Sequence, residues 1–208
     1  DQTSAETNLT SAFAVGTGTR VLNTQKLFTQ GSLITTDNAL DAAIEGSGFF
    51  QVLLPDDRIG YTRNGTFSRN AEGVLTTGSG YVVQPEIQIP EGASQINISG
   101  NGVVSIVADG AVVAEEVGQL TLADFANPRG LQPVGESFSV ETQASGPPII
   151  ANPQEEGFGK LVQGALESSN VNVVQELVDM IETQRAYEVS SKSISSVDEM
   201  LRFLSQNL

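Results

Sequence analysis

The stretch SNVNVVQELVDMIETQRAYEVSSKSISSVDEMLRFLSQNL, residues 169–208, decides how this chain is built. From Val173 onward an apolar residue returns at every seventh position as far as Leu208. Such a repeat is typical of a helix that packs lengthwise on another helix. It predicts a C-terminal assembly helix of coiled-coil type over residues 170–208. The predicted assembly seam consists of Val173, Leu177, Met180, Ile181, Tyr187, Ile194, Leu201, Leu204 and Leu208.

The predicted helix has a recognisable start, and its apolar residues occupy more than one face at both ends. Asn172 followed by Gln175 resembles a capping box. A helix from Val173 to Leu208 would be ~54 Å long, about twice the width of a compact body. The serine-rich centre, VSSKSISS at 189–196, lowers helix propensity by roughly 0.5 kcal/mol per serine. A helix resting on one surface needs only one apolar stripe, so these faces favour burial by other chains.

A second interpretation of the helix stays open. An ordinary amphipathic helix folded back on its own β domain would also place apolar residues at helical spacing. No other segment of the sequence is long and periodic enough to be a helical partner.

Composition excludes several classes of function. The chain has 208 residues and 39% hydrophobic content, enough for one sizeable core with one appendage. Its net charge of −15 repels phosphates, so nucleic acid and anionic membranes are poor partners. Cysteine and histidine are both absent, which excludes disulfides, thiolate chemistry, Ser-His-Asp triads and histidine-bound metals.

Other motifs offer little chemistry. The acidic pair at Asp56 and Asp57 and similar pairs elsewhere are not expected to act in acid–base or metal chemistry, because adjacent residues point to opposite faces on a strand and are mostly solvated on a loop. The glycine-rich stretch at 16–20 opens no helix and lacks the lysine of a phosphate loop. No apolar run reaches the ~18 residues of a membrane span. We therefore expect no enzyme, no cofactor, no metal and no membrane insertion; residues 1–13 form a polar lead-in or the cut edge of a longer chain.

Residues 14–143 predict an antiparallel β-rich body. Asn64-Gly65 predicts a hairpin turn, and the turns at 101–102 and 109–110 predict a strand between them. Residues 144–169, rich in proline and glycine, are expected to connect body and helix and to lie along the body. The predicted fold is mainly β with a long C-terminal helix. Further strands are expected at AAIEG (42–46), FFQVLL (49–54), YVVQ (81–84), EIQI (86–89), QINIS (95–99) and GQLTLADF (118–125).

Asp41, Ile44, Gly46, Gly48 and the following residues form one motif group, and Asn170, Asn172 and Arg185 belong to a second about 90 residues later. Together these groups resemble one protein family, the axial proteins of the bacterial flagellum that form its rod and hook. The first group is similar to the family motif D-x-A-I-x-G-x-G-F-F-x-V and to the residues that follow it. The second is similar to the family's C-terminal signature. The motif residues that carry the resemblance are Asp41, Ile44, Gly46, Gly48, Phe49, Phe50, Tyr61, Arg63, Gly65, Asn170, Asn172 and Arg185.

The resemblance implies a function by polymerisation. In the family, N- and C-terminal helices pair and pack into the core of a tube. No segment here matches the N-terminal helix, which would be the missing partner of 173–208. The stretches at 16–21, 84–90 and 140–146 resemble a distal rod subunit, a part of the drive shaft that transmits torque from motor to hook.

The resemblance also implies partners and a location. The partners are copies of this chain, proximal rod proteins, hook protein and the rings of the cell wall and outer membrane. The location is the flagellar basal body, crossing the periplasm after export by the flagellar secretion system. Two alternatives stay open: a proximal rod or hook subunit, and a secreted β-sandwich binding module with an oligomerisation helix. A binding module would show a concave patch lined by aromatic side chains.

Overall fold

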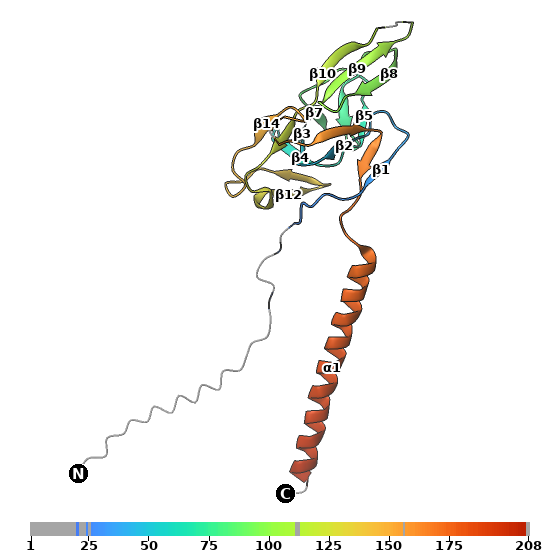
Figure 1. The fold of residues 1–208 in the computed structure, drawn as a ribbon. Coiled ribbons are helices and arrows are strands. Elements are labelled where there is room, and N and C mark those ends of the chain that lie inside the picture. The colour runs from blue at the N-terminus through green and yellow to red at the C-terminus, as the bar shows by residue number, and fades with distance from the viewer. Residues whose placement is uncertain (1–19, 21–23, 25, 111–112, 156, 207–208) are drawn as a thin grey trace, which may run out of the picture.

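The computed structural model describes residues 20, 24, 26–110, 113–155 and 157–206. In this part of the chain a β body carries one α-helix, α1 (Val173–Gln206), which extends away from the body (Figure 1). The predicted fold class, mainly antiparallel β with a long C-terminal helix, is confirmed. The lead-in at 1–13 and Leu208 lie outside the described residues. Coiled-coil pairing of α1 stays a prediction.

All ladders between the strands of the body are antiparallel. The largest sheet has seven strands in the order β12 (Gln132–Gly135), β13 (Phe138–Val140), β4 (Ile59–Thr62), β3 (Phe50–Leu53), β7 (Val82–Gln84), β6 (Leu75–Thr77) and β5 (Phe67–Arg69). A three-stranded sheet joins β10 (Glu115–Gln119), β9 (Val103–Ala108) and β8 (Ala93–Ile98). The two-stranded sheets pair β1 (Leu33–Thr35) with β16 (Ala165–Glu167), β11 (Leu122–Asp124) with β14 (Ile149–Ala151), and β15 (Lys160–Gln163) with β2 (Ala42–Glu45). A short 3₁₀ turn, η1, spans Pro128–Gly130.

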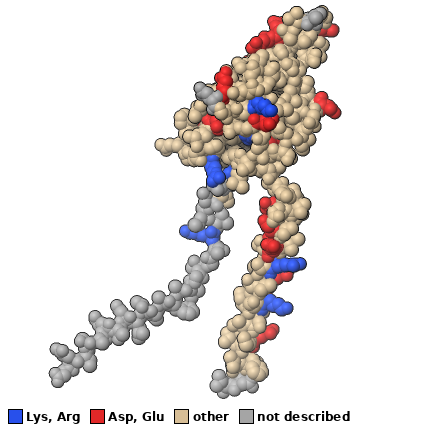
Figure 2. Space-filling model, in the orientation of Figure 1, with Lys and Arg blue, Asp and Glu red and all other residues tan. Residues whose placement is uncertain are grey.

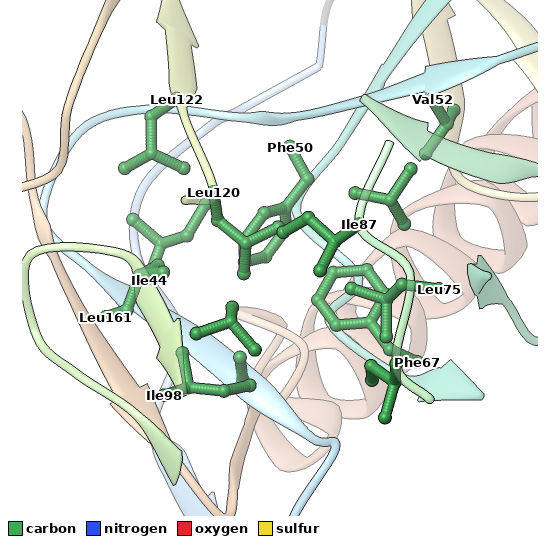
Figure 3. Packing of buried hydrophobic residues seen from close by; sticks show 14 of the residues in the cluster. Ile44, Phe50, Val52, Phe67, Leu75, Ile87, Ile98, Leu120, Leu122 and Leu161 are labelled. Carbon is green, nitrogen blue, oxygen red and sulfur yellow. The ribbon is translucent and has the colours of Figure 1, made fainter. Parts of the chain in front are cut away.

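The core lies where these sheets meet. Phe50 and Phe67 pack edge to face at 5.0 Å between ring centroids, and Leu120 lies in the same cluster (Figure 3). The polar side chain of Gln51 is also buried in the centre of the sheet, where it donates to the hydroxyl of Thr121 at 3.1 Å. A smaller cluster joins Phe49, Tyr61, Ala123, Phe125 and Leu131. The body therefore has its own apolar core, to which α1 contributes no buried residue.

The hairpin predicted at Asn64-Gly65 is wrong. Strands β4 and β5 on either side of it are not neighbours, because β5 pairs with β6 and β4 pairs with β3 and β13. Gly65 instead runs beside β2, where its carbonyl accepts a hydrogen bond from Ala42 N at 3.0 Å. A Cβ at Gly65 would lie 1.6 Å from the Ala42 carbonyl oxygen. Close approach of two backbones, and not a tight turn, requires glycine here.

The other turn predictions are confirmed, whereas two strand predictions need correction. Gly102 and Gly110 both adopt positive φ, and β9 lies between them. The stretch 86–89 forms only an isolated bridge from Gln88 to Val74, although Ile87 and Ile89 are buried. The strand expected at 118–125 is two strands, β10 and β11, because the chain passes from one sheet to another at Leu120.

The stretch expected to connect body and helix contains strands of the body. Strands β14, β15 and β16 pair with β11, β2 and β1, so this stretch closes three small sheets. Leu161 is buried in the core, but Ile149 and Ile150 are each 54% exposed. The prolines and glycines that argued against a sheet lie mainly between these short strands, where they do not interrupt a ladder.

Candidate assembly site: the exposed helix and its joint with the body

Helix α1 begins with the cap that the sequence predicted. The side-chain oxygen of Asn172 accepts from the backbone N–H of Val174 at 3.1 Å and of Gln175 at 3.3 Å. The second half of the expected capping box is absent, because Gln175 donates forward to Asp179 at 2.8 Å. One acceptor thus satisfies two amides that would otherwise have no partner at the helix start.

Along its described length α1 is exposed, and this holds for its apolar residues as well. Tyr187 is 77% exposed and Ile194 is 71% exposed. The structure places the other described members of the predicted seam on the same uncovered helix, and Arg185 is exposed there too. Charged side chains are scattered along a mostly uncharged helix surface (Figure 2), and Arg202 forms an exposed ion pair with Asp198 at 3.7 Å. The exposed large apolar residues of α1 are Val173, Val174, Leu177, Val178, Met180, Ile181, Tyr187, Val189, Ile194, Val197, Met200, Leu201, Phe203 and Leu204.

The serine-rich centre of α1 turns its hydroxyls back on the helix. Ser190, Ser193 and Ser195 donate to the carbonyl oxygens four residues earlier at 2.8, 2.8 and 3.1 Å. Such bonds satisfy the hydroxyls but add little to helix stability. The predicted weakness of the centre stays a prediction.

At the other end of the site, Arg63 organises the base of the body. It follows β4, and its side chain is only 18% exposed. The guanidinium donates to Glu167 Oε2 at 2.8 Å and to the carbonyls of Gly46 and Gly48 at 3.1 Å each. It also lies over the ring of Phe49, 5.9 Å from the centroid. A planar cation with several fixed donors suits such a cluster, since it satisfies a carboxylate and two carbonyls together.

The glycines of the family motif make this cluster possible. Gly46 and Gly48 adopt φ of +121° and +130°, which other residues rarely adopt. A Cβ at Gly46 would lie 2.7 Å from the Cα of Gly159. This backbone directs two carbonyl oxygens toward Arg63.

Residues 27–31, which precede the first strand, are bonded to the same cluster. Gln30 donates to the Ile44 carbonyl and accepts from Gly46 N, both at 3.1 Å. Glu167 uses its second oxygen to accept from Gly31 N at 2.9 Å. The chain entering the body is therefore fastened to the chain leaving it.

Asn170 completes the cluster just before the helix. Its side-chain amide lies within bonding distance of the carbonyls of Leu27 and Thr29, at 3.1 and 3.0 Å, and of the Thr29 hydroxyl at 2.8 Å. We call this set, namely Gln30, Arg63, Glu167, Asn170 and their backbone partners in 27–31 and 44–48, the joint. A groove of about 350 Å³ runs along it.

Asp41, the first residue of the motif, lies nearby and has a purely structural set of contacts. It is buried and accepts from Thr36 Oγ1 and Asn38 Nδ2, both at 2.8 Å. Its carbonyl accepts from Gly164 N at 2.8 Å, which ties the chain before β2 to the turn before β16.

Two titratable groups outside the joint have perturbed pKa values. Burial, together with nearby Glu141, raises the pKa of Tyr61 to about 12. The hydrogen bond from Arg58 lowers the pKa of Asp56. Both follow from ordinary desolvation and ion pairing. The described residues hold no group of three or more acidic, histidine or cysteine side chains arranged to bind a metal ion.

Comparison with known proteins gives a family for both parts of the molecule. The model described as the flagellar hook protein FlgE/F/G D1 domain matches residues 43–106. The model described as the flagellar basal body rod FlgEFG protein C-terminal matches residues 162–207. Together these ranges contain the motif glycines, Arg63 and the whole described helix.

Individual relatives agree with the family models. The chain is 52% identical to the flagellar basal-body rod protein FlgG of Buchnera aphidicola (subsp. Acyrthosiphon pisum) over 98% of this chain and 78% of the relative. It is 43% identical to the protein of the same name from Caulobacter vibrioides over 99% of this chain and 79% of the relative. The chain belongs to the flagellar hook and basal-body rod protein family. A further family member, FlgF of Escherichia coli, is 35% identical over 82% of this chain.

In this structure, the two motifs that the sequence showed about 90 residues apart meet in space at the joint. Arg63 and the motif glycines come from one, and Asn170 comes from the other. The sequence did not reveal Gln30 and Glu167, the residues that link them. Glu167 is a single acid in a short strand, and no periodicity marks it as the partner of a residue 104 positions away.

Proposed function

We propose that this chain is a structural subunit of the distal rod of the bacterial flagellum, where it polymerises into the tubular shaft that transmits torque from motor to hook. One observation carries the proposal: a helix of 34 residues has no buried residue, although it bears a long series of large apolar side chains. The relatives named basal-body rod protein FlgG, at 43–52% identity, support the rod and its distal part.

In the proposed mechanism, helices of neighbouring subunits bury one another's apolar faces inside the shaft, and the β bodies pack outside it. Burying a large apolar side chain contributes about 1.5 kcal/mol or more, so the eight described seam residues supply roughly 12 kcal/mol. Association costs ~4 kcal/mol or more in lost freedom of motion. Burial of the seam therefore offsets a large part of this cost, and several contacts per subunit would make association cooperative.

The proposed partners are further copies of this chain, proximal rod proteins, hook protein and the rings of the cell wall and outer membrane. The proposed location is the basal body, where the shaft crosses the periplasm after export by the flagellar secretion system. No described helix combines the length and apolar character needed to cross a membrane. We propose no catalytic role, in keeping with a structural family.

The alternatives are less well supported. A proximal rod or hook subunit would use the same helix, but the FlgF relative is less similar, at 35% identity, than the FlgG relatives cited above. A binding module would need an open aromatic surface. In this structure Phe49 and Tyr61 are buried, and both pack edge to face against Phe125.

Substitution within the seam tests the proposal. Ile194→Asp would place a charge among packed helices at a cost of several kcal/mol, so rods should not assemble from this variant. Ser196→Asp adds the same charge two residues further on, about 200° around the helix, and should be tolerated better. Assembly is followed by electron microscopy of basal bodies, and folding of the body by thermal unfolding. Normal rods from Ile194→Asp would refute burial of the seam.

A further inference from the structure

The link between the last strand of the body and the helix is short but extensively bonded. Five residues, 168–172, separate the end of β16 from the start of α1. Ser168 N donates to Ser32 O at 2.8 Å, Asn170 bonds to residues 27–29, and Asn172 caps the helix. An unbonded link of this length would let the helix swivel about the body. Here three of its five residues are held.

We propose that Arg63 and Asn170 are positioning residues that hold α1 at one angle to the body before a subunit enters the polymer. This inference rests on the proposed function as a rod subunit. Asn170 acts directly, because it fastens the link to residues 27–29. Arg63 acts through other residues: it holds Glu167, the residue just before the link, and the carbonyls of segment 44–48, to which Gln30 is bonded.

The contacts of the joint favour a single orientation of the link relative to the body. Arg63 and Glu167 are 18% and 11% exposed, so their ion pair is shielded from water and stronger than a surface pair. Gln30 and Arg63 bond to the backbone of 44–48, whereas Glu167 and Asn170 bond to 27–31, so the entering and the leaving chain are both held. Segments 27–31, 44–48 and 167–170 therefore move as one unit.

A helix angle that is already fixed in the free subunit would favour assembly. A subunit whose helix already points in the required direction loses less freedom of motion when it is incorporated. A loose joint would raise the concentration of subunits needed for assembly. In an assembled shaft, a joint that fixes the angle between α1 and the body would also transmit torque from the helices of the inner tube to the bodies outside it.

Distances between two spin labels test the angle directly. The chain contains no cysteine, so Ser68→Cys on β5 and Glu182→Cys on α1 give the only two labels. Double electron–electron resonance on the dilute full chain then reports how widely the helix moves relative to the body. The parent protein should give a single narrow distance distribution.

Asn170→Asp is the decisive variant, because it keeps the size of the side chain but removes the donor and faces two carbonyls with an anion. We expect loss of the single narrow distribution, with a thermal midpoint within a few degrees of the parent's. Arg63→Lys keeps the charge but not the fixed fork of donors, and should broaden the distribution to a lesser degree. Asn127→Asp is the matched control: it loses a single donor bond to Ala144 O, away from the joint, and should leave the distribution narrow.

Two outcomes of the distance measurement would contradict the proposal. A broad distribution in the parent, or a narrow one in both Asn170→Asp and Arg63→Lys, would show that these residues do not set the angle. The measurement uses monomers and does not depend on polymerisation. Failure of the joint is thus distinguishable from failure of the rod assignment, which Ile194→Asp tests.

Discussion

The body and the helix use apolar residues in opposite ways. In the body, Phe50, Leu120 and their neighbours are fully buried in a cluster that the chain closes by itself. In α1, residues of the same kind, such as Leu177 and Leu201, lie open along 34 residues. The body satisfies its own hydrophobic surface, whereas the helix leaves it for another molecule. The stability of the isolated chain should therefore depend on the body alone, and assembly on the helix.

The largest expected effect comes from removing the same side chain in each region. Leu120→Ala should lower the free energy of unfolding by ~2–5 kcal/mol, because it leaves a cavity at a fully buried position. Leu201→Ala removes a leucine that is 58% exposed and should change the stability of the monomer by no more than ~0.5 kcal/mol. Denaturant unfolding of both variants measures the difference. Equal losses would mean that α1 packs on the body.

Alkaline pH is expected to lower the free energy of unfolding by a smaller amount, and this effect too should arise from a residue of the body. The pKa of Tyr61 is raised to about 12, so the folded state holds a proton that the unfolded chain loses near pH 10. The stability that this group contributes is present below pH 10 and is lost as pH rises from 10 to 12. Absorbance titration should show a late phenolate step that is missing in Tyr61→Phe. A titration curve unchanged by the substitution would contradict the burial of this phenol.

The smallest effect is expected from removing the helix altogether. A chain ending at Ser168 keeps the core and the Arg63–Glu167 pair and loses only the contacts of Asn170 with 27–29. It should keep a cooperative thermal transition whose midpoint lies within a few degrees of the parent's, since exposed hydrogen bonds contribute about 1 kcal/mol each. Loss of the transition would place the helix in the core of the domain.

The sequence predicted elements more reliably than their pairing. Seven-residue spacing and Asn172 were sufficient to place α1 and its start, because both signals are local. The hairpin predicted at Asn64-Gly65 was wrong, because glycine is required there by the close backbone of β2, more than 20 residues earlier in the sequence. Strands β14–β16 were missed because each has only three or four residues, and their partners lie far away in the sequence.

The same distinction holds for the candidate site. The resemblance to the family named Arg63, Gly46, Gly48 and Asn170 but gave no reason for them. The structure supplies one: the glycines turn carbonyls toward Arg63, and Asn170 fastens the start of the helix. Glu167 became visible only when the fold brought it within 2.8 Å of Arg63. Long-range polar pairs leave no periodic trace in one sequence.

Hydrogen exchange of the helix amides, compared between dilute monomer and assembled polymer, tests most directly whether other subunits bury α1. In the monomer, the amides after about Glu188 should exchange rapidly, because the serine-rich centre has low helix propensity and no packed neighbour. In the polymer the same amides should be strongly protected. Strong protection of residues 190–206 in a demonstrated monomer would show that the helix is stabilised without other subunits, and would contradict its role as an assembly surface.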